Sequence, residues 1–417
     1  LERITNRNSS MLPTKRTFVL VFVSAVIGLG LLEVGAALIL NLRGSGLSPA
    51  PQRHLYATYR GHKLNPAYRH AKDTDNLLLH TPDGFRGIDP VVKTKPGNVF
   101  RIIMFGGSAM YGLGAYAERY DYQPALRSNE TIDHMLEMQL RERFVEELAG
   151  NQIEVLNAGL TGYQTFQHLI HYNERLHQYS PDLILFLDGH NDFYITRSGH
   201  NHWLDYDYIS TFLAEPFNQR SIYLAVFAGV RVIAPYSHFF TLCEKYFAQR
   251  LAKEQRQMKQ TRRTNVTMTS EEAVGPSYST VAHNTYLRVY EQFKALSAFD
   301  DFDWLVLLQP EIIFEQDIHL GVADIKTKRI TEQSYGHPRV KRMKTVRTLL
   351  PELFKRNSIP FVDFGTIGNA NLKAKKLYGD HVHLAPAGAK RVASMIVDQI
   401  DRQGFIQNWI EQNTWDK

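Results

Sequence analysis

The sequence VFRIIMFGGS, residues 99–108, holds six apolar residues among its first seven and ends on two glycines and a serine. A near-continuous apolar run without alternation is typical of a strand that is buried on both faces of a parallel sheet. Parallel sheets bind ligands at the carboxyl ends of their strands. The run therefore predicts a central strand, and it places Ser108 at the edge of the sheet where chemistry is expected.

Four more apolar runs follow, each bounded by turn residues: IEVLNAG (153–159), DLILFLDG (182–189), DWLVLLQP (303–310) and IPFVDFG (359–365). Helical patterns separate them, with apolar residues three or four positions apart. These residues are Ile132, Leu136, Leu140 and Phe144, then Phe166, Leu169, Ile170 and Leu176, and, after Pro386, Val392, Met395 and Ile396. Strands that alternate with helices predict a doubly wound, flavodoxin-like parallel α/β sheet of about five strands.

Two stretches lie outside this pattern. Residues 43–98 are polar and predict a linker that then packs onto the domain formed by residues 99–417. Residues 194–302 are far longer than one crossover requires and predict an insertion. It contains an aromatic cluster (Trp203, Tyr206 and Tyr208), an apolar run (223–230) and a basic run (249–263). We expect the cluster to pack within the insertion, the apolar run to form a buried or interfacial helix, and the basic run to be a solvated helix face. Alternatively, the aromatic cluster stacks on sugar rings, and the basic run contacts an anionic partner.

The N-terminal region contains an apolar segment at residues 18–42, about the length of a helix that spans a bilayer. Its only charge is Glu33, and Arg3, Arg7, Lys15 and Arg16 precede it. Basic residues before a span predict a cytoplasmic N-terminus, here residues 1–17, and an extracytoplasmic remainder, periplasmic or at the cell surface. We expect an uncleaved single-pass anchor, and a cleaved signal peptide is the alternative. Met11 lies just before the basic pair, so residues 1–10 are expected to be an extension or a start-site artefact.

The composition excludes some classes of protein. Hydrophobic residues make up 44% of the 417 residues, which is enough for one large domain with a core. The net charge of +6 is modest for this length and does not by itself indicate nucleic acid, which requires a basic stripe on one face, so we expect no nucleic acid partner. Cys243 is the only cysteine, which excludes a disulfide within the chain.

Polar groups at three strand ends suggest a site for an oxyanion. Ser108 follows the first run, and the glycines before it allow a tight turn beside its hydroxyl. Gly159 ends the second run, and Asn191 follows the third run in the sequence GHND (189–192). The Ser108 N–H, the Gly159 N–H and the Asn191 amide are able to converge on one oxygen, as a tetrahedral intermediate requires.

The loop after the last run, DHVHLAPAG (380–388), contains a histidine that follows an aspartate by three residues. A serine nucleophile needs a base, and the base needs a group that orients it. The Asp380 carboxylate is able to accept the N–H of one ring nitrogen of His383 and leave the other nitrogen facing Ser108. Pro386 suits the first turn of the final helix.

Together these blocks resemble those of the SGNH/GDSL hydrolase superfamily, with FGGS in place of the commoner GDS form, then NAG, GHND and DHVH. The resemblance covers roughly residues 99–400 apart from the insertion. It implies Ser108 as nucleophile, His383 as base and Asp380 as its partner. It also implies Gly159 and Asn191 in the oxyanion hole, with Asp192 as structural support. Gly107 stands where many relatives carry an aspartate that is not part of the triad. The anchor, the linker and FGGS together look like a membrane-tethered bacterial subgroup, sometimes linked to cell-surface polysaccharide.

Other groups of polar residues give weaker predictions of a metal site or of pocket residues. His168 and His171 are three apart on a predicted helix, but no third ligand has a suitable spacing, so we expect no metal and no cofactor. Gln309 and Glu311 end the fourth run and are expected to shape the pocket. Ser108 is not in a G-x-S-x-G sequence, which argues against an α/β-hydrolase elbow.

The predicted function is therefore an extracytoplasmic serine esterase that acts on an acyl ester, with an O-acetyl group on a carbohydrate as one candidate. An O-acyltransferase uses the same residues and remains open. A lysophospholipase, a thioesterase and a non-catalytic glycan-binding scaffold are the further alternatives. The sequence does not identify the acyl group, the alcohol or the oligomeric state.

Overall fold

Five parallel strands form the centre of the structure, which is a computed structural model. It describes residues 15–42, 54–57, 60–66, 68, 80–87, 89–113, 126–195, 237–243, 246 and 286–414. The strands are β3 (Val99–Gly106), β4 (Gln152–Asn157), β5 (Leu183–Asp188), β6 (Asp303–Leu308) and β7 (Phe361–Asp363), in the spatial order β4-β3-β5-β6-β7. The chain starts in the middle of the sheet and winds outward in both directions, so the predicted doubly wound sheet is confirmed.

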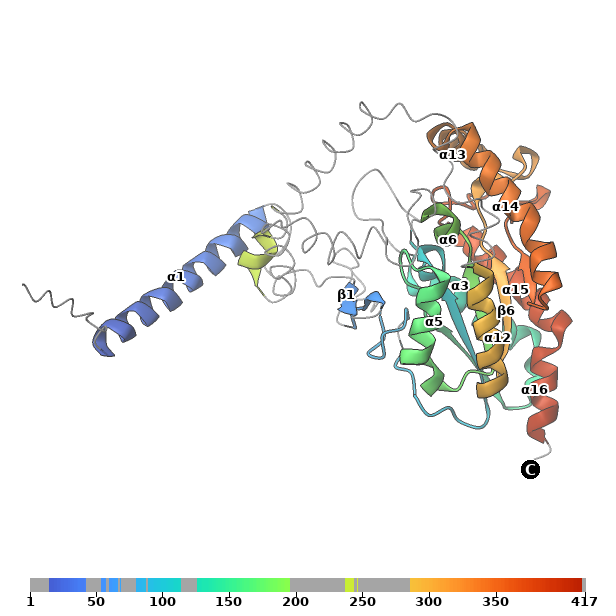
Figure 1. Cartoon of the computed structure of the whole chain (residues 1–417), viewed down its shortest axis with the longest axis horizontal. Helices are drawn as coiled ribbons and strands as arrows, with labels where there is room; N and C mark the ends of the chain where they lie inside the picture. The colour runs from blue at the N-terminus through green and yellow to red at the C-terminus, as the bar shows by residue number, and fades with distance from the viewer. Residues whose placement is uncertain are drawn as a thin grey trace, which may run out of the picture. The chain divides into compact units, whose positions relative to one another are not determined.

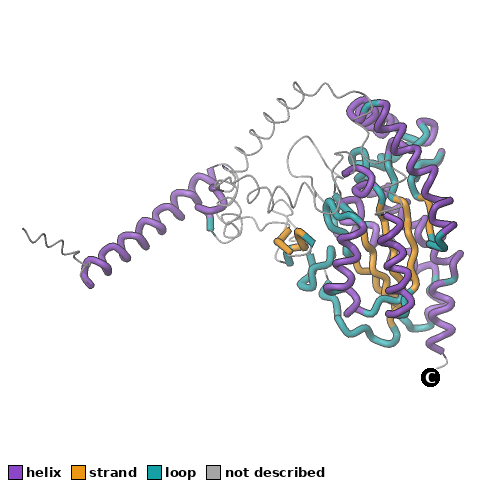
Figure 2. The backbone as a smooth tube through the Cα atoms, in the orientation of Figure 1, coloured by secondary structure: helices purple, strands orange, loops and turns teal. Residues whose placement is uncertain are grey.

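Helices cover both faces of this sheet, as Figures 1 and 2 show. Beside the short α2 (Ser108–Tyr111), α4 (Val145–Leu148) and α6 (His190–Ile195), the longer ones are α3 (Ile132–Arg143), α5 (Thr165–Glu174), α12 (Arg288–Asp300), α13 (Val322–Tyr335), α14 (His337–Arg356), α15 (Pro386–Gln403) and α16 (Phe405–Thr414). Short 3-10 turns lie at η1 (Ser128–Glu130), η2 (Leu176–Tyr179), η7 (Ile312–Phe314), η8 (Asp317–His319) and η9 (Ala370–Leu372). The three predicted helical patterns correspond to α3, α5 and α15.

The core has two halves because successive side chains of a strand point to opposite faces. Ile102 and Met104 of β3 join a cluster with residues of α3, α15 and α16. Ile103 and Phe105 join a second cluster, with aromatic residues of α5, α12 and α14. All four side chains are fully buried, so the run at 99–105 is covered on both faces as predicted.

The last strand differs from its prediction. The run at 359–365 predicted a strand that is buried on both faces, but the three residues of β7 are only half-buried. β7 lies at the edge of the sheet and pairs with β6 alone, and its Phe361 and Val362 side chains pack against the two core clusters without being fully covered.

The described part of the predicted linker contains a hairpin, β1 (His54–Ala57) and β2 (Gly61–Leu64), followed by buried polar residues. Arg86 donates to the Ser128 hydroxyl (2.8 Å) and lies over the ring of Tyr111. Arg60 forms an ion pair with Glu174 and contacts the Tyr163 hydroxyl (3.3 Å). These contacts fix the segment onto the elements that surround the end of β3.

The chain divides into two compact units, one of Gln52–Asp207 with Met268–Lys417, the other of Leu1–Pro51 with Tyr208–Thr267. The second unit contains α1 (Lys15–Leu42) and a short helix at 238–243. Val19–Leu42 is long and apolar enough to cross a membrane, although a signal sequence meets the same criteria. The aromatic cluster (Trp203, Tyr206 and Tyr208), the apolar run at 223–230 and the basic run at 249–263 lie outside the described residues.

Candidate active site

Ser108 is the first residue of α2, directly after β3. Its position depends on the two glycines before it. A Cβ atom at Gly106 would lie 2.5 Å from Met110 Cβ and 2.7 Å from the Leu187 carbonyl oxygen, so only glycine lets α2 turn back this closely onto the sheet. The turn leaves the Ser108 side chain partly exposed at the carboxyl edge of the strands.

The loop at 379–385 presents the histidine to this serine. Gly379 N–H donates to the His383 carbonyl (2.7 Å), and Ala385 N–H donates to the Leu377 carbonyl (2.9 Å), which closes a tight loop before α15. Pro386 is the first residue of α15, as predicted. The Asp380 carboxylate accepts the backbone N–H groups of Val382 (3.0 Å) and His383 (2.9 Å) through one oxygen.

His383 lies within hydrogen-bond distance of both other predicted triad residues. His383 Nε2 is 2.6 Å from Ser108 Oγ, and His383 Nδ1 is 2.7 Å from the second oxygen of Asp380. This arrangement assigns the Nδ1 proton to the bond with Asp380 and leaves Nε2 to accept the serine proton. The tertiary fold thus brings together residues 275 positions apart in the chain.

The charge on Asp380 suits its place beside the histidine. Burial would raise the pKa of this carboxyl, but the hydrogen bond from His383, the charges of His383 and His381, and the Val382 N–H outweigh it and hold the pKa well below its ordinary value. Asp380 is therefore ionised at neutral pH and able to stabilise an imidazolium at His383.

His381, the other histidine of this loop, lies beside His190 of α6. Its ring centroid is 5.5 Å from that of His190 and 6.4 Å from that of His383, and its Nδ1 is 3.7 Å from Asp380. His381 thus faces a histidine of α6, while His383 faces the serine.

The side-chain amide of Asn191 lies close to Gly107, the residue that precedes Ser108. Its Nδ2 donates to the Tyr163 carbonyl (2.8 Å), and a Cβ atom at position 107 would lie only 2.5 Å from that nitrogen. The amide therefore rests against the peptide that precedes Ser108. One N–H of this amide is used by Tyr163, and the other is the candidate donor to an oxyanion.

Gly159, the predicted second donor to the oxyanion, lies two residues after the end of β4. Its N–H donates to Asn157 Oδ1 (2.9 Å), so this donor already has a partner within its own turn. A Cβ atom here would lie 2.7 Å from Tyr111 N, at the far end of α2 from Ser108. The glycine is required for packing against α2, and its role as an oxyanion donor stays a prediction. Gly162, whose φ of 75° favours glycine, immediately precedes the Tyr163 that Asn191 contacts.

Asp192 supports the Asn191 turn from behind. One of its oxygens accepts the N–H (3.0 Å) and the hydroxyl (2.8 Å) of Thr165, which joins α6 to the start of α5. Burial, followed by the negative charge of Asp188, raises the pKa of Asp192 to about 7 even though the bonds from Thr165 lower it.

A buried polar group below the site was missed from the sequence. Asp188, the last residue of β5, is 3.0 Å from His168 Nε2 and accepts a hydrogen bond from the Tyr290 hydroxyl (3.2 Å). His168 and His171 are thus interior residues of α5, both buried against Phe105. No group of three or more potential ligands for a metal occurs among the described residues.

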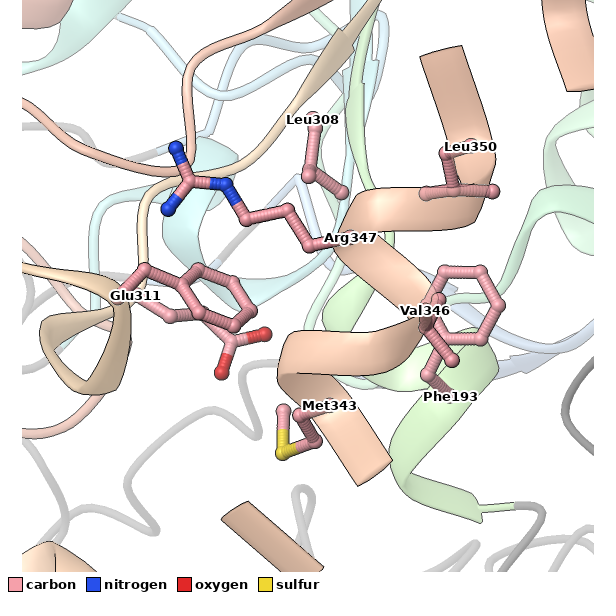
Figure 3. Close-up of a pocket in the computed structure, with 8 residues that line it drawn as sticks. Phe193, Leu308, Glu311, Met343, Val346, Arg347 and Leu350 are labelled. Atoms are coloured by element: carbon pink, nitrogen blue, oxygen red, sulfur yellow. The ribbon is translucent and has the colours of Figure 1, made fainter. Parts of the chain in front are cut away.

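Glu311 and His190 form a second pair at this edge. Their Oε1 and Nδ1 atoms are 3.1 Å apart, and both side chains are buried. Glu311 also borders a small, mostly apolar pocket (Figure 3) lined by Phe193, Leu308, Phe314, Met343, Val346, Arg347 and Leu350. None of the triad residues lines this pocket. The other predicted pocket residue, Gln309, is buried, and its N–H donates to the Asp188 carbonyl (2.8 Å).

No protein-family model and no curated protein matches the chain. Among solved structures it is similar to the acetyl xylan esterase AlAXEase, with 10% identity over 72% of this chain and 99% of that one and a TM-score of 0.36. It is also similar to a putative GDSL-like lipase from Parabacteroides merdae ATCC 43184, with 14% identity over 76% and 100% and a TM-score of 0.36. A third is an acetyl xylan esterase from Geobacillus stearothermophilus, with 13% identity over 74% and 97% and a TM-score of 0.36. At such identities and scores, we base the function on the site itself.

Proposed function

We propose that this protein is a serine esterase of the SGNH/GDSL type, anchored in a membrane, that cleaves an acyl ester through a covalent acyl-enzyme. The observation that carries the proposal is the pair of short distances around His383, 2.6 Å to Ser108 Oγ and 2.7 Å to Asp380. A serine, a histidine and an ionised aspartate in this order constitute a nucleophile, a base and the group that orients the base.

Acylation begins when Ser108 Oγ attacks the ester carbonyl carbon and its proton passes to His383 Nε2. The carbonyl π electrons move to oxygen, and Asp380 stabilises the imidazolium. We assign the stabilisation of this oxyanion to the Asn191 amide and to the Ser108 N–H, since the first N–H groups of a helix have no acceptor within it. Each donor of this type contributes about 3 kcal/mol to transition-state stabilisation.

The intermediate then collapses and the bond to the alcohol oxygen breaks. The alcohol leaves with the proton from His383, and the acyl group remains on Ser108. Water repeats the sequence: His383 removes its proton, the resulting oxygen attacks the acyl carbon, and the proton returns to Ser108 Oγ as the carboxylic acid is released. If a sugar hydroxyl takes the place of water, the same residues perform an acyl transfer.

The test is a panel of p-nitrophenyl esters of graded chain length, together with an O-acetylated polysaccharide whose released acetate is measured, with Ser108→Ala as the control. A fluorophosphonate probe should label the wild-type protein and fail on Ser108→Ala. Asp380→Ala should be the mildest of the triad variants, because the oxyanion donors persist. Equal probe labelling of wild type and Ser108→Ala would refute the nucleophile assignment. Acyl groups appearing on an added sugar, instead of free acid, would favour the transferase.

The proposed location is outside the cytoplasm, with α1 as the anchor. The basic flank before the apolar helix motivates this orientation. A phosphatase that is active only outside the cytoplasm, fused after Lys417, should be active in cells, and a fusion active only in the cytoplasm would overturn it.

A further inference from the structure

The apolar helix α1 carries a single carboxylate, Glu33, whose partners come from a distant part of the chain. Ser237 Oγ donates to it (2.7 Å), and so do the backbone N–H groups of His238 (2.5 Å) and Phe239 (3.1 Å). His238 Nδ1 lies a further 2.7 Å from the same carboxylate. These contacts, more than 200 positions apart in sequence, all lie within one compact unit.

The segment that supplies these donors is the beginning of a helix. Thr241 N–H donates to the Ser237 carbonyl (2.9 Å), and Phe240 N–H donates to Ser237 Oγ (3.2 Å), so Ser237 caps the helix at 238–243. The first N–H groups of a helix lack partners within it. In this segment Glu33 is the acceptor for two of them, and a carboxylate there also complements the helix dipole.

The covered surface of α1 is confined to one stripe beside Glu33. Ala36 and Leu40, three and seven positions further along, are 3% and 1% exposed. Val34 and Leu38 on the other faces remain 68% and 56% exposed. Positions 33, 36 and 40 follow the helical repeat, so a second element packs along this face of α1.

Glu33 lies nine residues before the end of the span at Leu42, which is about 14 Å along the helix axis. The hydrocarbon core of a bilayer is about 30 Å thick, so a span of this length holds Glu33 inside it. Polar groups at that depth need partners within the protein, because no water is present to supply them. The donors at 237–239 meet that need, and the side chains that follow, Phe239, Phe240 and Leu242, are apolar.

We propose that residues 237–243 lie within the lipid bilayer, packed on α1 and held there by the hydrogen bonds to Glu33. The chain would then contact the membrane through two segments, the anchor and this part of the insertion. Residues 237–243 lie in the chain between α6, which carries Asn191, and α12, so the connection from β5 to β6 includes the segment proposed to lie in the membrane. The proposal does not depend on the esterase activity.

The native Cys243 makes the proposal testable in the full-length protein, because it is the only cysteine and lies in this segment. A nitroxide on Cys243 is measured in liposomes by its collision rates with oxygen and with a polar nickel chelate. Two references are made in a Cys243→Ser background: Leu29→Cys on an exposed part of α1 for the bilayer, and Ala298→Cys on an exposed position of α12 for water. Collisions with nickel should be about tenfold fewer at Cys243 than at Ala298→Cys, since a polar chelate is excluded from hydrocarbon.

Glu33→Ala should move the Cys243 collision rates toward those of Ala298→Cys, while Val34→Ala, on the neighbouring uncovered face, should leave them unchanged. Glu33→Gln keeps one acceptor oxygen and should give an intermediate shift. Far-ultraviolet circular dichroism monitors the folding of each variant. Wild-type rates at Cys243 equal to those at Ala298→Cys would overturn the proposal. Rates that stay equal to those at Leu29→Cys in Glu33→Ala would overturn the role of the Glu33 contact.

Discussion

Gly107→Ala should inactivate the enzyme by displacing Asn191, without unfolding the protein. The added Cβ would lie 2.5 Å from Asn191 Nδ2, whereas an ordinary contact needs about 3.4–4 Å. The amide must therefore move by about 1 Å. It is the end of a short side chain and not backbone, so the movement itself costs little stability, but it breaks the 2.8 Å bond to the Tyr163 carbonyl.

The magnitude follows from the role proposed for that amide. Loss of one oxyanion donor costs about 3–4 kcal/mol in the transition state, which lowers kcat by about 10²–10³-fold. The free energy of unfolding should fall by about 1 kcal/mol, the net contribution of one hydrogen bond. Turnover of p-nitrophenyl acetate measures the loss in kcat, and urea denaturation measures the loss in the free energy of unfolding.

The matched comparison is a double-mutant cycle. Asn191→Ala should reduce kcat to a similar extent, and adding Gly107→Ala to it should have little further effect, because both changes remove the same donor. Fluorophosphonate labelling should remain measurable in all three variants, since Ser108 and His383 are intact. A Gly107→Ala variant with wild-type kcat, or losses that multiply in the double variant, would refute the reasoning.

Three further outcomes are expected. Ser108→Ala and His383→Ala should each lower kcat/KM by at least about 10⁴-fold, while His381→Ala retains most activity; a dead His381→Ala beside an active His383→Ala would reverse this assignment. Asp192 has a folded pKa of about 7, above its ordinary 3.8, so its contribution to stability is complete below pH 3.8 and is lost as pH rises through 7, by up to about 4 kcal/mol. Denaturation at pH 5 and pH 8 should therefore show a smaller difference for Asp192→Asn than for wild type, and an equal difference would contradict the shift. Asn157→Leu removes the side-chain hydrogen bonds of Asn157 with the Met110 carbonyl, the Asp133 carboxylate and the Gly159 N–H and should lower the free energy of unfolding by about 2–5 kcal/mol, measured by urea denaturation; a loss below about 1 kcal/mol would show that these groups find other bonds.

The parallel direction of the strands was predictable because strands buried on both faces of a parallel sheet need uninterrupted apolar runs. The composition of the run at 99–105 alone indicates burial on both faces, and β3 appears where it was expected. The burial of the run at 359–365 depends instead on its neighbours in the sheet. It contains Pro360 and Asp363 beside its apolar residues, and β7 has a partner on one side only.

In the candidate site too, some features were predictable from the sequence and others were not. Asp380 and His383 are three residues apart on one loop, so their spacing was enough to suggest the contact that the structure contains. Gly159 was assigned by its place at the end of a strand, but the direction of its N–H depends on Asn157, two residues earlier, whose side chain accepts it. Chain order places a glycine at the edge of the sheet and does not show where its N–H points.

The sequence alone determined the parallel α/β architecture and the apolar helix that ends at Leu42, and it suggested the residue types of the proposed triad, because each depends on composition or on spacing within one segment. Only the tertiary structure decided which distant groups meet: His383 with Ser108, Glu311 with His190, and Glu33 with Ser237. A carboxylate in an apolar helix indicates that hydrogen-bond donors must lie close to it, but hydrogen bonds extend only about 3 Å. Which donors come that close is determined by how the whole chain packs, and no local pattern encodes it.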